Sequence, residues 1–172
     1  MKTLKTLAII GLLAILAAVG GAVYFFGGYY NVAGAHEDPG IVNWALTYVR
    51  QASIERHAKD RPPANLNDPA TVQAGARAFV TRGCPTCHGA PGVEWVKFSE
   101  GMRPYPPDLK DLANERTPQQ LFFVVKNGIK MTGMPGFGLI EAPDEEIWNI
   151  VAFVKKLPDI SEADYKAWSA QP

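Results

Sequence analysis

The chain has few cysteines for its length and no excess of charge of either sign. Only two of its 172 residues are cysteine, so disulfide bonds cannot hold the fold together as they do in small secreted domains. Its 17 basic and 17 acidic residues balance, which argues against a nucleic acid as partner. No segment alternates polar and apolar residues as a β-strand would. The sequence therefore predicts an all-α protein whose two cysteines serve chemistry rather than architecture.

A long apolar run occupies the N-terminus. Residues 7–26 are apolar or small throughout, and they follow Lys2 and Lys5. In a helix about 20 such residues rise about 30 Å, enough to cross the hydrocarbon layer of a lipid bilayer. Lysines before the run predict an N-terminus in the cytoplasm and export of the rest. We therefore expect a single-pass protein of the bacterial inner membrane, with its bulk in the periplasm.

Two other interpretations of this run remain open. A cleaved signal peptide has a shorter apolar core, about 7–15 residues, and ends at small residues such as those at 33–35. A helix buried in a soluble protein would also be apolar. Both the anchor and the signal peptide export residues 36–172.

Turn and helix-capping signals divide the remaining chain. We expect four segments: an anchor or signal at 1–30, an extension with an amphipathic helix and linker at 31–65, a main domain at 66–160, and a short C-terminal helix or tail at 161–172.

The spacing of apolar residues, together with Asp-Pro, Thr-Pro and Asn-Gly signals at the helix ends, predicts where helices form. The expected helices cover residues 39–59, 68–82, 117–127 and 144–157, and a short one begins at residue 161. Proline-rich residues 84–116 are expected to be mostly loop. A domain with so few short helices and such long loops buries little by itself, so an apolar group is expected at its centre.

The sequence CPTCH at 84–88 is the pattern of covalent haem attachment. Two thiols at this spacing, Cys84 and Cys87, reach one edge of a porphyrin, and the following His88 can bind its iron. A thioredoxin-like pair would need a βαβ context, a zinc site would need a fourth ligand, and a plain disulfide would leave His88 without a role. The pattern favours one covalent haem c over these alternatives.

Methionine is the candidate for the second iron ligand. Met134 lies in the glycine-flanked loop MTGMPGFG, where the backbone can approach a flat ring closely and proline stiffens the turn. Met131 is the runner-up, and Met102 follows. A methionine usually serves packing alone, but this loop offers no helical face to pack.

With CPTCH and MTGMPGFG in this order, residues 66–158 resemble a class I c-type cytochrome of the small periplasmic or membrane-anchored bacterial kind. Gly75 and Phe79 resemble contact positions of that family's N-terminal helix. Ile150 and Phe153 resemble their partners on its C-terminal helix. The resemblance implies a cytochrome c fold around one haem.

The resemblance also suggests residues around the haem. A proline carbonyl that accepts a hydrogen bond from the proximal histidine would belong to Pro106 or Pro107. Arg103, Tyr105 and Trp95 are candidate partners of the haem propionates.

The function implied is single-electron transfer without catalysis, with redox proteins in or at the membrane as partners. The runner-up is a fixed cytochrome subunit of a larger membrane oxidoreductase, docked through the helix at 39–59. A haem sensor or peroxidase-like enzyme is a further alternative, although no distal acid or base stands out.

Overall fold

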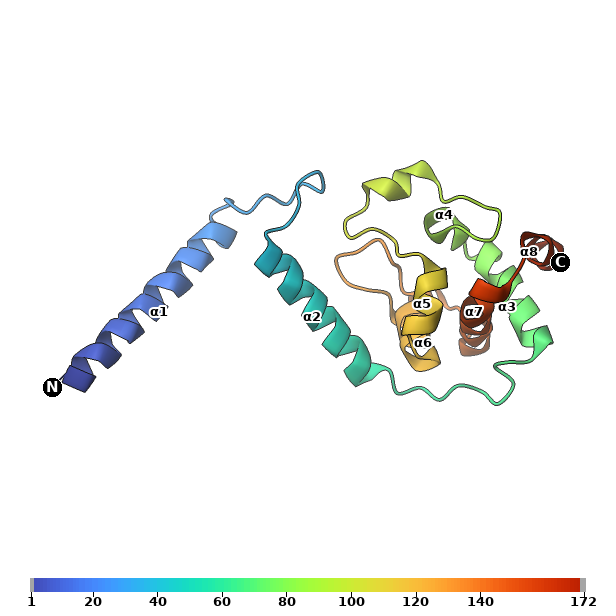
Figure 1. Ribbon diagram of the computed structural model, residues 1–172, viewed down its shortest axis with the longest axis horizontal. Coiled ribbons are helices and arrows are strands. Elements are labelled where there is room, and N and C mark those ends of the chain that lie inside the picture. Colours follow the sequence, from blue (N-terminus) through green and yellow to red (C-terminus); the bar gives the residue numbers. More distant parts are fainter. Residues whose placement is uncertain (1, 171–172) are drawn as a thin grey trace. The chain divides into compact units, whose positions relative to one another are not determined.

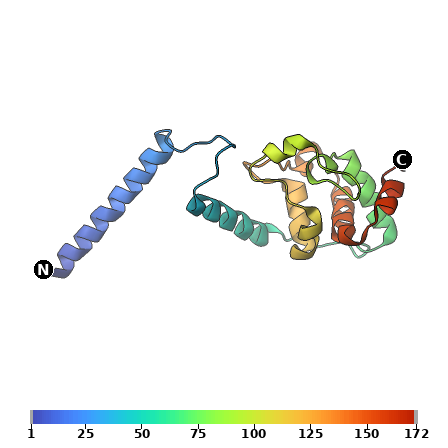
Figure 2. The ribbon, with the colours of Figure 1, turned by 45° about the horizontal axis from the view of Figure 1, so that its top comes forward.

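The computed structural model describes residues 2–170, which divide into two units between Glu37 and Asp38 (Figure 1). The first unit contains α1 (Lys2–Phe26), a helix of 25 residues with no buried side chain. By length and composition α1 can cross a membrane, a test that a signal sequence would also pass. The second unit contains all the other helices, and Figure 2 shows them from a second direction.

Four helices pack together in the second unit: α3 (Pro69–Thr81), α6 (Pro118–Asn127), α7 (Asp144–Lys156) and α8 (Glu162–Ser169). Their starts follow the sequence signals. Thr117 and Gln120 form a reciprocal capping box at the start of α6, and the Ser161 side chain accepts a hydrogen bond from the backbone of Asp164 at the start of α8. The described residues contain no strand, only an isolated bridge between Ala90 and Val93. The all-α class is thus confirmed.

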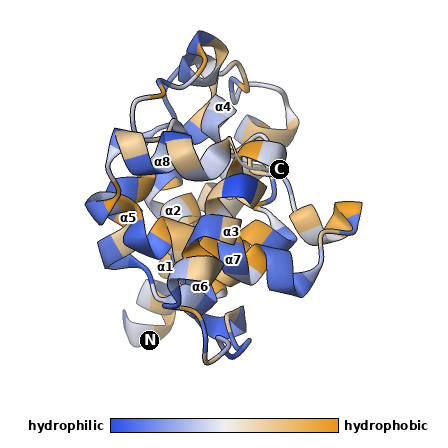
Figure 3. Cartoon of the chain, turned by 90° about the vertical axis from the view of Figure 1, so that its right-hand side faces the viewer, coloured by the Kyte–Doolittle hydropathy of each residue, from blue (hydrophilic) through white to orange (hydrophobic). Residues whose placement is uncertain are grey.

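The core forms where α3, α6 and α7 meet. The Phe79 and Phe153 rings lie 5.2 Å apart, and Phe122 stacks on Trp148 with ring centroids 4.0 Å apart. Each core helix carries polar residues as well as apolar ones (Figure 3), and the apolar side turns inward.

The crossing of α3 and α7 depends on a glycine. A Cβ atom at Gly75 would lie 1.9 Å from the Asn149 carbonyl oxygen and 2.8 Å from the Phe153 Cβ. The two backbones can therefore approach this closely only because residue 75 lacks a side chain.

Residues 84–116 contain more helix than expected. The structure adds α4 (Pro85–His88), a short 3₁₀ turn η1 (Lys97–Gly101) and α5 (Leu109–Glu115). Asp108 caps α5 by accepting a hydrogen bond from the Lys110 backbone. Leu109 and Ala113 are buried, so packing stabilises a helix too short to stand out in the sequence.

Helix α2 (Gly40–His57) forms where a helix was expected, but its apolar stripe is not what packs. Ile41, Trp44 and Tyr48 are 74%, 66% and 63% exposed, whereas Ile54 is the one buried residue among those of α2. At the same end, the His57 ring stacks on Phe123 of α6, 6.1 Å between centroids. The C-terminal half of α2 is therefore the half that docks.

Candidate functional site

A cavity of about 460 Å³ lies at the centre of the second unit. Most of its lining is apolar and comes from α2, α3, α6, α7, the CPTCH turn and two loops. This volume falls in the range of about 300–1,000 Å³ that is usual for small-molecule sites. The domain therefore has a binding space as well as its packed core.

The CPTCH turn supplies one wall of the cavity. The Cys84 backbone donates to the carbonyl of Phe79 at 3.1 Å, so the turn follows directly from the end of α3. Gly83 precedes it with a positive φ of 74°, which a residue with a side chain rarely adopts. Cys84, Cys87 and His88 all line the cavity, and both cysteines are free thiols. Burial raises the pKa of Cys84 to about 12, so its thiol is protonated at neutral pH.

The imidazole of His88 is held by a backbone carbonyl. Its Nδ1 lies 3.0 Å from the Pro107 oxygen, and because a carbonyl only accepts, Nδ1 carries the proton. Nε2 is then the nitrogen with a free lone pair. Burial lowers the pKa of His88, while the hydrogen bond to Pro107 opposes that shift, so the ring is neutral and able to bind a metal. Of the two prolines suggested by the sequence, Pro107 makes this contact; Pro106 lines the cavity.

The Met134 loop forms another wall of the cavity. The Met134 backbone donates to Thr132 Oγ1 at 3.1 Å, and that hydroxyl donates to the Ile129 carbonyl at 2.8 Å. The Ile129 backbone in turn donates to the Met134 carbonyl at 3.2 Å. These three bonds close a tight turn that fixes the backbone of Met134.

Glycines let this turn lie against the end of α6. Gly128 has a φ of 68°, and a Cβ there would lie 2.6 Å from the Gly136 nitrogen. A Cβ at Gly136 would lie 2.7 Å from the Asn127 carbonyl oxygen. Bulkier residues at either position would push the methionine loop away from the helix.

The three candidate methionines differ in their surroundings. Met134 is partly buried and lines the cavity. Met131 is 97% exposed and lies outside the lining, which places the runner-up away from the CPTCH turn. Met102 also lines the cavity and sits against Gly133, where a Cβ would lie 2.7 Å from its sulfur. Met102 is therefore the alternative that shares the cavity with Met134.

The candidate propionate partners are not brought together. Tyr105 lines the cavity, and the Arg103 guanidinium stacks over its ring at 3.9 Å. Arg103 itself donates to the carbonyls of Glu100 and Met102 and lies outside the lining. Trp95 lies beside Gly89, half exposed and also outside the lining.

Several cavity residues were not singled out from the sequence. Three of them lie on α2, namely Arg50, Gln51 and Ile54. The other two are the arginines Arg82 and Arg116. Arg82 forms a two-point ion pair with Glu146 at 2.5 and 3.0 Å, which raises the pKa of Arg82. Arg82 lies two residues before Cys84, and this proximity to the CPTCH pattern could have identified it from the sequence as a cavity residue. No sequence signal identifies the residues on α2, because only the docking of that helix brings them to the cavity.

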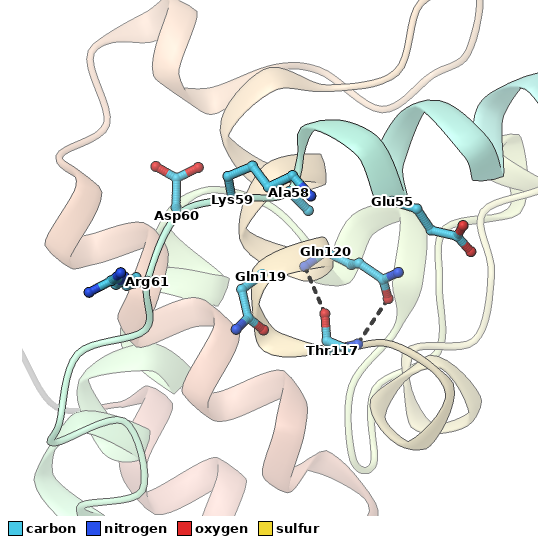
Figure 4. A pocket seen from close by; sticks show the side chains of 8 residues that line it. All are labelled: Glu55, Ala58, Lys59, Asp60, Arg61, Thr117, Gln119 and Gln120. Carbon is cyan, nitrogen blue, oxygen red and sulfur yellow. Dashed lines mark hydrogen bonds between the residues drawn. The ribbon is translucent and has the colours of Figure 1, made fainter.

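A second, more polar pocket of about 370 Å³ lies between the C-terminal end of α2 and the start of α6 (Figure 4). Its lining includes Glu55, Lys59 and the capping residues Thr117 and Gln120. Because the Gln120 side chain is used to cap α6, this pocket is best explained as the junction of two helices.

The donor set of the cavity fits a covalently attached haem. Two free thiols, a neutral imidazole and a thioether surround an apolar space, which is the combination that haem c uses. Among the described residues, no group of three or more His, Cys, Asp or Glu side chains could hold a bare metal ion.

One comparison with known proteins supports this interpretation. The family model described as cytochrome C oxidase, cbb3-type, subunit III matches residues 70–154, about half of the chain. No match was found among curated proteins or among solved structures. The matched region begins in α3 and ends in α7, so it contains the CPTCH turn and the Met134 loop but not α2.

Proposed function

The chain is a c-type cytochrome with covalently bound haem c, and from this premise we propose that it transfers single electrons on the periplasmic side of a membrane. The observation that carries the proposal is the meeting of Cys84, Cys87, His88 and Met134 on one apolar cavity. With two protein ligands on the iron, no position is left for a substrate, which favours electron transfer over catalysis.

Each of these residues has a distinct part in the proposal. Cys84 and Cys87 would hold the haem through thioether bonds, and His88 would bind its iron through Nε2. The Pro107 carbonyl fixes the orientation of the His88 ring and raises its basicity. Met134 would supply a neutral sulfur ligand to the iron, which favours its ferrous state. When bound, the haem accepts and releases one electron at a time.

Helix α1 is proposed to keep the protein at the membrane. Its side chains are exposed, and over residues 7–26 they are apolar or small, a surface that lipid accommodates and water does not. The lysines at its start favour a cytoplasmic N-terminus. A tethered carrier meets integral redox partners at a higher effective concentration than a free one.

A second candidate is a fixed cytochrome subunit of a larger membrane oxidoreductase. Two observations favour it: the exposed apolar side chains of α2, and the description of the matching family as an oxidase subunit. Purification in mild detergent separates the candidates. A lone monomer favours the carrier, and a stable stoichiometric complex favours the subunit.

Covalent haem is the first point to test. The chain made with a working haem-attachment system should give a pyridine haemochrome spectrum that survives washing with acidic acetone. The double variant Cys84→Ala/Cys87→Ala should lose it, and the matched variant Thr86→Ala, which keeps both thiols, should retain it. A colourless wild-type protein would refute the proposal.

The location of the haem domain needs a separate test. Protease added to intact spheroplasts should digest the domain, because it lies outside the inner membrane. Protection of the domain until the membrane is broken would contradict the periplasmic location.

A further inference from the structure

Helix α2 lies outside the family-matched region and yet forms part of the cavity wall. Arg50, Gln51 and Ile54 all line the cavity, and at this spacing they lie on one face of the helix. The 7% exposure of Ile54 and the stacking of His57 on Phe123 fix that face against α6. Packing of Ile54, one helical turn further along, therefore holds Arg50 and Gln51 at the cavity.

The charges on the cavity wall are of one sign. Arg50, Arg82 and Arg116 line it, and no Asp or Glu does so among the described residues. Arg82 is already paired with Glu146. Within residues 2–170, no carboxylate lies within ion-pair distance of Arg50 or Arg116. The wall thus carries guanidinium groups whose charge the described side chains do not offset.

The amide of Gln51 points to the same conclusion. Its Oε1 is buried and has no hydrogen-bond partner, alone among the buried side-chain nitrogen and oxygen atoms of the described residues. Other polar side chains at the cavity are engaged, since Gln120 caps α6 and Thr132 holds the Met134 loop. An unpaired buried amide destabilises the fold, so a polar partner is expected beside it, and a half-turn of the amide presents either its oxygen or its NH₂ group.

A haem brings such a partner. Its porphyrin carries two propionate groups, and a carboxylate held in a largely apolar cavity requires a cation and hydrogen-bond donors. We propose that Arg50, with Gln51 beside it, binds a haem propionate, which makes α2 an integral part of the haem site. This inference rests on the proposed function, because it requires the haem.

Binding of this kind has an electrostatic consequence. Reduction of the iron adds a negative charge, so a nearby cation favours the ferrous state. Loss of the Arg50 charge should therefore favour ferric haem. Arg56 offers a matched control, because it lies on the same helix with the same charge but is exposed and lies outside the cavity lining.

The experiment is a redox titration of the full-length holoprotein in detergent. In Arg50→Gln, the ferrous-to-ferric ratio at a fixed ambient potential should fall about threefold to tenfold, where tenfold corresponds to about 59 mV for one electron. Arg56→Gln should change the ratio less than about twofold, because its charge is solvated. Equal effects of the two variants, or none, would overturn the proposal.

Arg50→Lys covers the case in which Arg50→Gln fails to fold. Lysine keeps the charge but not the planar fork of donors, so the propionate bending band in the resonance Raman spectrum should shift relative to wild type. An unchanged band would overturn the proposal. Failure of the underlying function has a separate signature, since the wild-type protein itself would then lack covalent haem.

Discussion

At the scale of the residue, the two proposed iron ligands are held in different ways. The His88 ring donates a hydrogen bond directly to the Pro107 carbonyl, whereas the Met134 side chain has no hydrogen-bond donor and depends on its backbone for its position. The position of the sulfur is therefore set by the turn that Thr132 closes. Substitutions in that turn should affect the methionine side of the haem more than the histidine side.

Replacement of Met134 tests the sulfur ligand. Met134→Ala removes a neutral thioether that favours ferrous iron, so the ferrous-to-ferric ratio at fixed potential should fall by about tenfold or more. Redox titration measures this, and the reduced variant should also bind carbon monoxide. Met102→Leu is the control, since Met102 lines the same cavity. A large effect in Met102→Leu and none in Met134→Ala would reverse the assignment.

Thr132 offers a subtler test of the same loop. Thr132→Val keeps the shape but removes the hydroxyl that bonds Ile129 and Met134, which should cost about 1–2 kcal/mol of unfolding free energy. Thr132→Ser retains the hydroxyl and should stay close to wild type. Chemical denaturation of the holoproteins provides the values. Equal stability of the two variants would show that these hydrogen bonds do not hold the turn.

Sequence reasoning reaches only some of these residues. Cys84, Cys87 and His88 stand together, so their spacing alone indicates the chemistry. Adjacent backbone carbonyls point in different directions, so only the structure of the loop shows that Pro107, and not Pro106, accepts the hydrogen bond from His88. Arg50 and Gln51 lie more than 30 residues before the cysteines, and only tertiary packing brings them to the cavity.

At the scale of the element, the crossing of α3 and α7 has the least tolerance for change. Gly75→Ala should destabilise the holoprotein by about 1–3 kcal/mol, because the added methyl group would meet the Asn149 carbonyl and force the helices apart. Thermal unfolding, followed by circular dichroism, measures the loss.

Gly40→Ala is the matched control for this substitution. Gly40 begins α2, and a Cβ there would have no neighbour within 4 Å. Its replacement should be neutral or stabilise the protein by up to about 1 kcal/mol, since alanine has the higher helix propensity. If both variants unfold at the wild-type temperature, the close approach of α3 and α7 is not needed for stability.

Prediction succeeds for elements with strong local signals and fails for those that depend on packing. The starts of α3, α6 and α8 follow from Asp-Pro, Thr-Pro and serine caps. Helix α5 was missed because seven residues after a proline-rich stretch show little periodicity, and burial of Leu109 and Ala113 supplies the stability. For α2 the helix was predicted and its stripe with Trp44 and Tyr48 is exposed, whereas the packing of its other end through Ile54 depends on tertiary structure and was not predicted.

At the scale of the whole molecule, α1 is separable from the haem-binding unit. It contributes no buried residue, and the hydrophobic core begins at Leu66. Replacing residues 2–26 with a cleavable export signal should release a coloured protein into the soluble periplasmic fraction, with the spectrum and midpoint potential of the parent. Cell fractionation and redox titration measure these properties.

The full-length chain is the comparison for this truncation. It should stay with the membrane until detergent is added, and its N-terminal peptide should be found by mass spectrometry. Release of the full-length chain without detergent, with a new N-terminus near residues 33–35, would show that α1 is a cleaved signal instead of an anchor.

The central cavity also has a consequence for the abundance of this protein in the cell. Its lining is mostly apolar, and a haem that covers this surface stabilises the fold as the burial of any apolar surface does. The entire stability of a domain is only about 5–15 kcal/mol, so a contribution of a few kcal/mol is a large part of it. A polypeptide without its porphyrin would thus unfold readily and be degraded by proteases. We therefore expect the abundance of this protein to follow the supply of haem more closely than the rate of its synthesis.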